Sequence, residues 1–283
     1  MQVVRSIGEV RALRPRFASL GLVPTMGFLH AGHLSLVERA RRDCGAVAVS
    51  IFVNPTQFGP GEDLGRYPRD LPRDLEALAA AGVDLVFTPE PDEIYPTGFA
   101  THIDVGPVAG PLEGASRPGH FAGVATVVAK LFNIFQPDRA YFGQKDAQQT
   151  VVIRRMARDL DLPVEVVVAP TVREPDGLAL SSRNAYLSAE ERARAPVLFI
   201  ALSAARTRFA AGERDADALR AIIRETIAAV PGLEIDYVSV ADPESLEELE
   251  SLGSGPALAS LAARLGHTRL IDNLLLGSVN QVG

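Results

Sequence analysis

The sequence predicts an α/β protein in which a Rossmann-like parallel sheet is flanked by helices and followed by a smaller C-terminal α+β domain. Strand-like and helix-like segments alternate through the first half of the chain, and this alternation is typical of parallel sheets. Polar turns that contain glycine follow several of these strands, and such sheets bind ligands at the carboxyl ends of their strands. The pattern changes after a strong turn signal, Glu174-Pro175-Asp176-Gly177.

The alternation defines a first domain over residues 1–176. Its expected strands are short runs rich in apolar residues, at 20–23, 46–53, 83–87, 101–105, 139–142 and 164–168. Its expected helices carry apolar residues at helical spacing; one follows His33, and the others cover residues 70–81, 121–135 and 146–160. The last expected strand, at 164–168, leads towards the turn at 174–177 that ends the domain. The 121–135 segment is apolar on most sides, so we expect that helix to be buried.

Residues 177–283 form the second, smaller domain. Its two helical patterns and its two apolar strand patterns cover residues 189–211, 216–230, 233–240 and 269–276. We interpret the acidic run at 245–251 as a solvated helix face or loop.

Composition narrows the classes of partner. The chain carries 28 basic and 35 acidic side chains, a net charge of −7, whereas a nucleic-acid-binding surface needs a clustered basic excess. No apolar run approaches the roughly 20 residues that span a bilayer, and the opening residues predict no signal peptide. The one cysteine, Cys44, excludes an internal disulfide and fits a cytoplasmic protein. We therefore expect small-molecule partners, with no nucleic acid and no membrane.

Two glycines and two histidines lie in the turn that follows the strand expected at 20–23. The turn reads Pro24-Thr25-Met26-Gly27-Phe28-Leu29-His30-Ala31-Gly32-His33. The N-terminus of a helix has unpaired backbone N–H groups and partial positive charge, so it attracts anions. Glycines let the backbone approach a ligand closely, and imidazoles can donate to phosphate oxygens. The alternative is structural, with His30 packed under the loop and His33 beginning the helix. The combination favours a phosphate site.

Familiar nucleotide-binding motifs are absent from the sequence. There is no Gly-x-x-x-x-Gly-Lys-Ser/Thr motif of a P-loop, and Gly59-x-Gly61 lacks the third glycine of a dinucleotide fingerprint. His30 and His33 have no nearby cysteine, third histidine or carboxylate to complete a zinc site. The turn at 24–33 is therefore the main candidate for a nucleotide site.

Amide side chains follow the strand expected at 46–53, in Asn54-Pro55-Thr56-Gln57-Phe58. Amides offer both donors and acceptors to a small polar substrate without a charge to desolvate. An ordinary Asx or proline turn explains Asn54 and Pro55 equally well but does not account for Gln57.

A lysine stands where a later strand runs into a helix, in Tyr141-Phe142-Gly143-Gln144-Lys145-Asp146. The chain has only two lysines, Lys130 and Lys145, and a lysine at a strand end suggests a compact donor for phosphate. If the helix begins near Lys145, then Gln149 lies one turn away on the same face. An exposed lysine at a helix start is the alternative.

Two further segments carry polar groups that suit anions. Leu180-Ser181-Ser182-Arg183-Asn184 offers hydroxyls and a guanidinium to phosphate oxygens, with a capping or linker role as the alternative. Arg117-Pro118-Gly119-His120-Phe121 precedes the buried helix, and for His120 we favour capping or packing over contact with a ligand. We interpret His102 and His267 as structural.

With these segments the sequence resembles the pantoate–β-alanine ligases, also called pantothenate synthetases. The resemblance covers most of the chain and extends into the second domain through Arg264-Leu265-Gly266 and Thr268-Arg269-Leu270-Ile271-Asp272-Asn273. The His30-x-x-His33 turn is also similar to the His-x-Gly-His signature of nucleotidylyltransferases and class I aminoacyl-tRNA synthetases. One departure is visible, because Ala31 stands where the family is expected to carry an acidic residue.

The resemblance implies an ATP-dependent condensation of (R)-pantoate with β-alanine to pantothenate. The carboxylate of pantoate attacks the α-phosphorus of Mg–ATP, which gives pantoyl adenylate and pyrophosphate. The amine of β-alanine then attacks the acyl carbon and releases AMP. The resemblance also implies Mg²⁺ with the ATP, a cytoplasmic homodimer, a nucleotide- and pantoate-binding domain over 1–176 and a lid domain over 177–283. It assigns no residue to Mg²⁺.

The resemblance gives four residues a catalytic role. His33 is implied to be the proton donor or leaving-group stabiliser, with His30 beside it on the triphosphate. Lys145 and Arg183 are implied to neutralise charge on the phosphates. Such a reaction needs positioning and stabilisation of charge more than covalent help from the protein.

The resemblance also implies the substrate contacts. Gln57 and Gln149 hold pantoate, and Gln57 also lies near β-alanine. The implied ATP site consists of Met26, Gly27, Phe28, Leu29, His30, Ala31, Gly32, His33, Gly143, Gln144, Lys145, Asp146, Val172, Leu180, Ser181, Ser182 and Arg183. Further candidates are Asn54, Tyr67 and Arg117.

Two other functions compete with the ligase. A nucleotidylyltransferase would join a nucleotide to a phosphorylated substrate and keep the nucleotidyl group in its product. A non-catalytic nucleotide-binding module would bind ATP without turnover.

Overall fold

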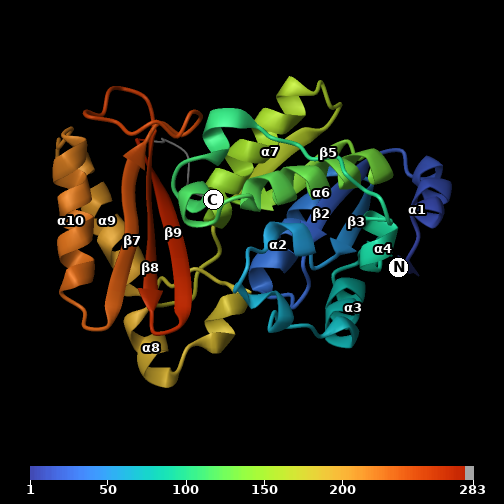
Figure 1. Ribbon diagram of the computed structural model, residues 1–283, viewed down its shortest axis with the longest axis horizontal. Coiled ribbons are helices and arrows are strands. Elements are labelled where there is room, and N and C mark those ends of the chain that lie inside the picture. The colour runs from blue at the N-terminus through green and yellow to red at the C-terminus, as the bar shows by residue number, and fades with distance from the viewer. Residues whose placement is uncertain (278–283) are drawn as a thin grey trace. The chain divides into compact units, whose positions relative to one another are not determined.

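The computed structural model describes residues 1–277, which divide into two compact units. The first unit comprises Met1–Gly143 and Gln148–Ala169, and the second comprises Gln144–Ala147 and the chain from Pro170 onward. Figure 1 shows the elements of both units. The domain boundary between residues 176 and 177 stays a prediction.

A six-stranded sheet forms the centre of the first unit, in the order β1-β4-β3-β2-β5-β6, and every neighbouring pair is parallel. The strands are β1 (Gln2–Val4), β2 (Leu20–Thr25), β3 (Ala46–Ile51), β4 (Leu85–Phe87), β5 (Arg139–Gly143) and β6 (Glu165–Ala169). β2 and β3 are buried over nearly their whole length, and so they are continuous apolar runs without alternation. The chain adds β3 on one side of β2 and β5 on the other. The carboxyl ends of these three strands meet at the topological switch of the sheet, where α/β proteins bind ligands.

Helices flank this sheet, as Figure 1 shows. They are α1 (Ile7–Leu13), α2 (Ala31–Asp43), α3 (Leu71–Ala80), α4 (Pro91–Ile94), α5 (Glu113–Ser116), α6 (His120–Phe135) and α7 (Ala147–Asp159). Helix α2 buries Leu36 and Ala40 in a cluster with side chains of β2 and β3. Helix α6 is buried on most sides, as its sequence predicts, and its Phe135 ring lies edge-on to Phe87 of β4 with the centroids 5.8 Å apart.

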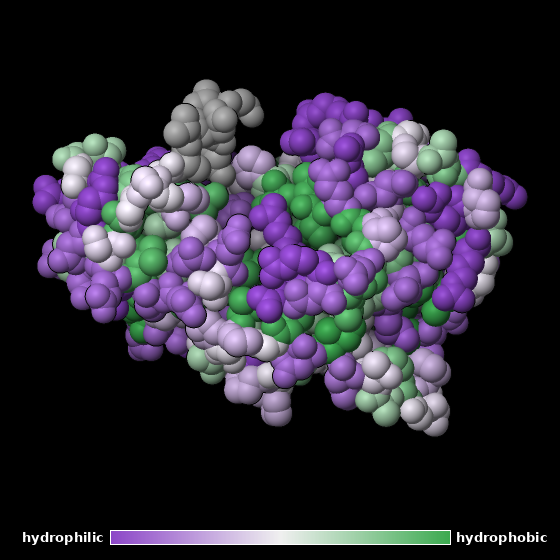
Figure 2. Space-filling model, turned by 90° about the horizontal axis from the view of Figure 1, so that it is seen from above, coloured by the Kyte–Doolittle hydropathy of each residue, from purple (hydrophilic) through white to green (hydrophobic). Residues whose placement is uncertain are grey.

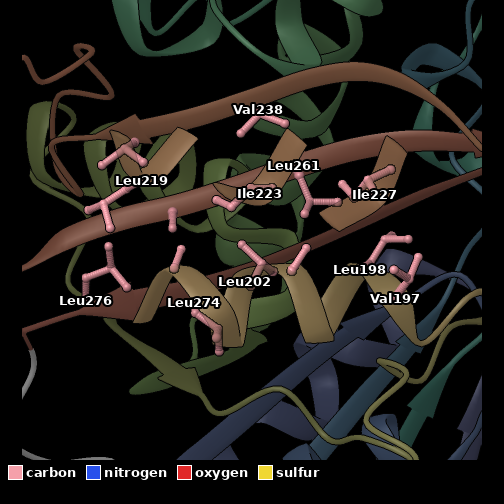
Figure 3. Close-up of a cluster of buried hydrophobic side chains, with 14 of the residues drawn as sticks. Val197, Leu198, Leu202, Leu219, Ile223, Ile227, Val238, Leu261, Leu274 and Leu276 are labelled. Atoms are coloured by element: carbon pink, nitrogen blue, oxygen red, sulfur yellow. The ribbon is translucent and has the colours of Figure 1, made fainter. Parts of the chain in front are cut away.

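The second unit contains an antiparallel sheet of three strands, β7 (Leu233–Ala241), β8 (Ala257–Leu265) and β9 (Thr268–Leu276). Its helices are α8 (Ala189–Arg194), α9 (Val197–Ala210) and α10 (Ala216–Ala228). Figure 3 shows how Leu202 of α9, Ile223 of α10 and Leu261 of β8 share one buried cluster. The predicted α/β fold with a smaller C-terminal α+β part is confirmed.

Three expectations from the sequence are wrong. Residues 101–105 form no strand; instead, the N–H of Ile103 donates to Oγ1 of Thr126 on α6 at 3.0 Å. The helix expected at 189–211 is two helices, because Pro196 has no N–H for the helical ladder. Strand β8 was not expected, since its alanine-rich sequence has weak strand propensity.

Hydrophilic residues cover much of the face shown in Figure 2, with smaller hydrophobic areas among them. Within residues 1–277, no helix combines the length and the apolar character that a membrane crossing requires.

Candidate functional site

Two residues in left-handed conformation open the turn between β2 and α2. They are Gly27, with φ of 80°, and Phe28, with φ of 51°. A Cβ atom on Gly27 would lie 3.0 Å from Cγ2 of Ile51 and 3.1 Å from Oδ2 of Asp74. Glycine at this position therefore serves both the backbone conformation and the close approach of its neighbours.

A buried carboxylate on α3 holds the same turn. Oδ2 of Asp74 accepts the N–H of Phe28 at 2.7 Å, and Oδ1 accepts the N–H of Leu29 at 2.7 Å. Burial raises the pKa of Asp74, although these two hydrogen bonds act in the opposite direction. Asp74 is not among the site residues that the sequence predicts. The available signal was its position one turn before the buried Leu78, on the apolar face of the helix.

His30 is the N-cap of α2, and His33 is the third residue of the helix. Nδ1 of His30 accepts the N–H of Gly32 at 3.1 Å, and Nδ1 of His33 accepts the N–H of His30 at 3.3 Å. Because a backbone N–H can only donate, both Nδ1 atoms are unprotonated and each neutral ring carries its proton on Nε2. Each ring can therefore cap the helix with Nδ1 and still donate from Nε2.

Several backbone N–H groups of this turn already have partners within the protein. Those of Phe28 and Leu29 donate to Asp74, and that of Gly32 donates to His30. A bare helix N-terminus would offer such groups to an anion. In this turn the N–H groups of Phe28, Leu29 and Gly32 are therefore already paired within the protein.

The turn that follows β3 is tied to its neighbours by Asn54, which is buried. Nδ2 of Asn54 donates to Oε1 of Gln57 at 3.0 Å and to the carbonyl of Gly123 at 3.2 Å. Oδ1 of Asn54 accepts the hydroxyl of Tyr95 at 2.8 Å. Nε2 of Gln57 lies 3.3 Å from Sδ of Met26. Two separate sequence segments, around Met26 and around Gln57, are thus in contact.

Arg117 and Tyr67 also contact this part of the first unit. Arg117 pairs with Glu62 at 2.6 Å and reaches the carbonyl of Gln57 at 3.3 Å. Burial acts to raise the pKa of Glu62, but the hydrogen bond and charge of Arg117 outweigh it, so this pKa lies below its ordinary value. The buried ring of Tyr67 lies edge-on to Phe58, with the centroids 6.0 Å apart.

Lys145 precedes α7, in a short 3-10 turn formed by Gln144–Asp146. The 3-10 turn runs directly into α7, which begins at Ala147, and a shared face for Lys145 and Gln149 stays a prediction. Lys145 belongs to the second unit, and Gln149, which is half-buried, belongs to the first. The residue pair expected from the helical pattern is therefore divided between the two units.

Asn273 of β9 holds the Lys145 turn within the second unit. Its Nδ2 donates to the carbonyls of Gln144 at 3.0 Å and of Lys145 at 2.8 Å. The side-chain amide of Gln144 donates back to Oδ1 of Asn273 at 3.0 Å. Nζ of Lys145 lies 3.5 Å from Oδ1 of Asp146. The backbone at Lys145 is thus fixed from a strand that lies more than a hundred residues further along the chain.

The remaining predicted residues of the second unit lie on a tight loop. The N–H of Leu180 donates to the carbonyl of Val172 at 3.0 Å. Ser181 caps a short 3-10 helix, Ser182–Tyr186, and its Oγ accepts the N–H of Arg183 at 3.3 Å. The capping interpretation of Ser181 is confirmed, whereas contact of this segment with phosphate stays a prediction.

The structure describes every predicted site residue and divides them between the two units. The first unit holds Met26 to His33, Asn54, Gln57, Tyr67, Arg117, Gly143 and Gln149. The second unit holds Gln144, Lys145, Asp146, Val172 and Leu180 to Arg183. Across the described chain, 1–277, no three His, Cys, Asp or Glu side chains are arranged to hold a metal ion.

The chain is similar over nearly its whole length to pantoate–β-alanine ligases. A family model described as pantoate-beta-alanine ligase matches residues 2–275. The pantothenate synthetase of Herpetosiphon aurantiacus is 63% identical over 276 residues, which cover 98% of this chain and 100% of that relative. The pantothenate synthetase of Chloroflexus aurantiacus is 64% identical over 277 residues, which cover 98% of each chain.

Solved structures give the same result. The crystal structure of pantothenate synthetase from Thermus thermophilus matches with a TM-score of 0.94 and 55% identity, covering 97% of this chain and 99% of that one. The pantoate-beta-alanine ligase from Francisella tularensis, complexed with beta-gamma ATP and β-alanine, matches with a TM-score of 0.81 and 35% identity, covering 97% of each chain.

Proposed function

We infer that this chain, which belongs to the pantoate–β-alanine ligase family and is an enzyme of that kind, joins (R)-pantoate to β-alanine with ATP. The complex of the Francisella tularensis relative with beta-gamma ATP and β-alanine supports ATP and β-alanine as two of these three substrates. The observation that carries the assignment of the site is the pair of histidines whose Nδ1 atoms both accept backbone N–H groups.

In the first step the pantoate carboxylate attacks the α-phosphorus of ATP. A P–O bond to pantoate forms, the bond to the bridging oxygen of the β-phosphate breaks, and pyrophosphate leaves with that electron pair. Negative charge builds up on the leaving oxygen, and a donor aimed there lowers the barrier. Nε2 of His33 is the proposed donor, with Nε2 of His30 beside it on the triphosphate.

In the second step the amine of β-alanine attacks the acyl carbon of pantoyl adenylate, and AMP leaves. Gln57 and Gln149 are proposed to hold pantoate through both steps, with Gln57 also near β-alanine. Their amides bind hydroxyls and carboxylate oxygens without bringing a charge that must be desolvated.

The remaining predicted residues are proposed to bind the nucleotide. Lys145 and Arg183 neutralise phosphate charge, and Ser181 and Ser182 hydrogen-bond the same oxygens. The other members of the proposed ATP site are Met26, Gly27, Phe28, Leu29, Ala31, Gly32, Gly143, Gln144, Asp146, Val172 and Leu180.

Mg²⁺ is proposed to enter as part of the substrate Mg–ATP. This ion commonly keeps several water ligands and binds phosphate oxygens together with only one or two carboxylates. Such a mode does not require a group of three protein ligands, and we assign no residue to the ion. We further propose that the chain works in the cytoplasm as a homodimer, with small molecules as its only other partners.

Pyrophosphate exchange tests the proposed function. With ATP and pantoate but no β-alanine, the enzyme should exchange labelled pyrophosphate into ATP, and AMP should appear only when β-alanine is added. Absence of exchange that depends on pantoate would contradict the adenylate route. Transfer of a nucleotidyl group that stays in the product would favour a nucleotidylyltransferase, and ATP binding without turnover would favour a binding module.

His33→Asn tests the role of the histidine within the same assay. An asparagine oxygen can still accept the N–H of His30 and so preserve the cap, but nothing replaces Nε2. We expect exchange to fall about 100-fold or more, since loss of one stabilising donor costs about that much, while ATP binding by calorimetry changes far less. His102→Asn, at an exposed position, is the control.

A further inference from the structure

A buried histidine at the start of α6 lies against the main chain of Gln57. The side chain is His120, which is 8% exposed. Its Nδ1 lies 2.8 Å from the carbonyl oxygen of Gln57, and its Nε2 lies 3.1 Å from Nη1 of Arg117. Because the carbonyl can only accept and the guanidinium can only donate, Nδ1 carries the proton and Nε2 does not. This is the opposite tautomer from that of His30 and His33.

A tight ion pair fixes this tautomer. Nε and Nη2 of Arg117 donate to the two carboxylate oxygens of Glu62 at 2.8 and 2.6 Å. A paired arrangement of this kind orients the guanidinium plane. The charged groups that face His120 are Arg117, Glu62 and Glu113. Burial and Arg117 lower the pKa of His120 to about 4, against the opposing effects of the Gln57 carbonyl and the two carboxylates.

Helix α6 also packs directly on the turn that carries Gln57. A Cβ atom on Gly123 would lie 2.6 Å from the carbonyl carbon of Thr56 and 2.8 Å from the nitrogen of Gln57, so only glycine allows this approach. From the side-chain end, Oε1 of Gln57 accepts from Asn54. Gln57 is thus held at its backbone by α6 and at its amide by Asn54.

We propose that His120 is a positioning residue for pantoate binding, which acts by fixing the carbonyl of Gln57, and that the Glu62–Arg117 pair keeps His120 in the tautomer that donates. The inference rests on the proposed role of Gln57. In this proposal His120 acts through the main chain of Gln57 and not by contact with substrate. Without the Nδ1–H of His120, the carbonyl of Gln57 loses the shorter of its two hydrogen bonds and keeps only the 3.3 Å bond from Arg117. The amide that should meet pantoate is then held less firmly in direction.

Two substitutions of His120 separate positioning from packing. His120→Leu fills the space but removes the donor, and it should raise KM for pantoate about tenfold while KM for ATP stays within about twofold. His120→Asn places an amide N–H near the position of Nδ1, and it should restore KM for pantoate to within about threefold of the wild type. His102→Leu, at an exposed histidine, is the control. Equal KM values for pantoate in the Leu and Asn variants, or no change in the Leu variant, would overturn the proposal.

Nuclear magnetic resonance tests the same inference without turnover. Imidazole ¹⁵N shifts should identify His120 as the Nδ1–H tautomer at pH 7, and the side-chain amide signals of Gln57 should shift in His120→Leu but not in His102→Leu. An Nε2–H tautomer, an imidazolium or unmoved Gln57 signals would overturn it. If the wild type lacks exchange that depends on pantoate while these spectra appear as expected, the proposed function fails and the positioning of Gln57 stands.

Discussion

The carboxylate of Asp74 accepts two consecutive backbone N–H groups of the histidine turn, and no neutral side chain of the same size can do so. Asp74→Asn places an amide N–H opposite one of those donors, which leaves the donor unsatisfied in a buried place and costs about 1–3 kcal/mol. We expect the turn before His30 to move and pantoate-dependent pyrophosphate exchange to fall about tenfold or more. Exchange rates measured at saturating ATP and pantoate check this.

Glu76→Gln is the matched control for Asp74→Asn, because Glu76 is exposed on the same helix and its replacement also removes one negative charge. If charge alone mattered, both variants would lose exchange equally. Equal losses, or full activity in Asp74→Asn, would show that the two hydrogen bonds do not shape the turn.

At the scale of single residues, sequence reasoning found the groups that stand next to each other in the chain. His30 and His33 share a turn with two glycines, and the structure gives that turn a defined capping geometry. The partners of such turns were not visible, because Asp74 lies 45 positions from Leu29 and Arg117 lies 60 positions from Gln57. Their importance depends on tertiary contacts, which a single sequence does not encode in any local pattern.

Strand β9 acts on the Lys145 turn through one side chain. Asn273→Asp replaces the amide that donates to the carbonyls of Gln144 and Lys145 with a carboxylate that faces two acceptors. Loss of these hydrogen bonds and the added repulsion should displace Lys145. We therefore expect the pyrophosphate exchange rate to fall about tenfold to 100-fold, with the far-ultraviolet circular dichroism spectrum unchanged.

Asn133→Asp on α6 is the control for Asn273→Asp. The amide of Asn133 also donates to a backbone carbonyl, that of Ala129 at 2.9 Å, but the residue is exposed. Exposed groups exchange such a hydrogen bond with water at little cost. A loss of exchange as large in Asn133→Asp as in Asn273→Asp would contradict a specific role for Asn273.

At the scale of elements, the strands that the sequence predicts best are those whose buried residues are strongly apolar. Strands β2 and β3 are buried on both faces, so their apolar runs identify them without ambiguity. Strand β8 is just as buried, yet four of its nine residues are alanines, whose intrinsic preference is not for strands. The prediction of a single helix across Pro196 is wrong for a local reason. Proline has no backbone N–H for the helical hydrogen bonds, and this is visible in the sequence itself.

At the scale of the whole molecule, the unit that carries a residue cannot be inferred from chain order. Lys145 lies between β5 and α7, both of which have their bulk in the first unit, yet Gln144–Ala147 belongs to the second. The cause is the set of hydrogen bonds between Asn273 and the turn at Gln144 and Lys145, which join this turn to β9. A single boundary in the sequence assumes that each unit is continuous. It therefore cannot describe a short segment such as Gln144–Ala147, which belongs to the second unit but is flanked by segments of the first.

Acid should destabilise the folded chain through His120. Its pKa is about 4 in the folded protein against 6.5 for an ordinary histidine. The unfolded chain therefore binds the proton more readily between pH 6.5 and 4, and stability that is fully present above pH 6.5 is lost as the pH falls through this range. The difference corresponds to a loss on the order of 3 kcal/mol from this one group.

The difference between the wild type and His120→Asn isolates this effect, because every other titrating group, Glu62 and Asp74 included, is common to both chains. Urea unfolding followed by circular dichroism at a series of pH values measures it, since the chain has no tryptophan for fluorescence. The urea concentration at the unfolding midpoint should fall more steeply for the wild type than for the variant between pH 6.5 and 4. Above pH 7 the midpoints of the two proteins should change with pH in the same way. Parallel curves throughout would mean that His120 titrates in the folded protein as it does in the unfolded chain, which contradicts its burial between Arg117 and the Gln57 carbonyl.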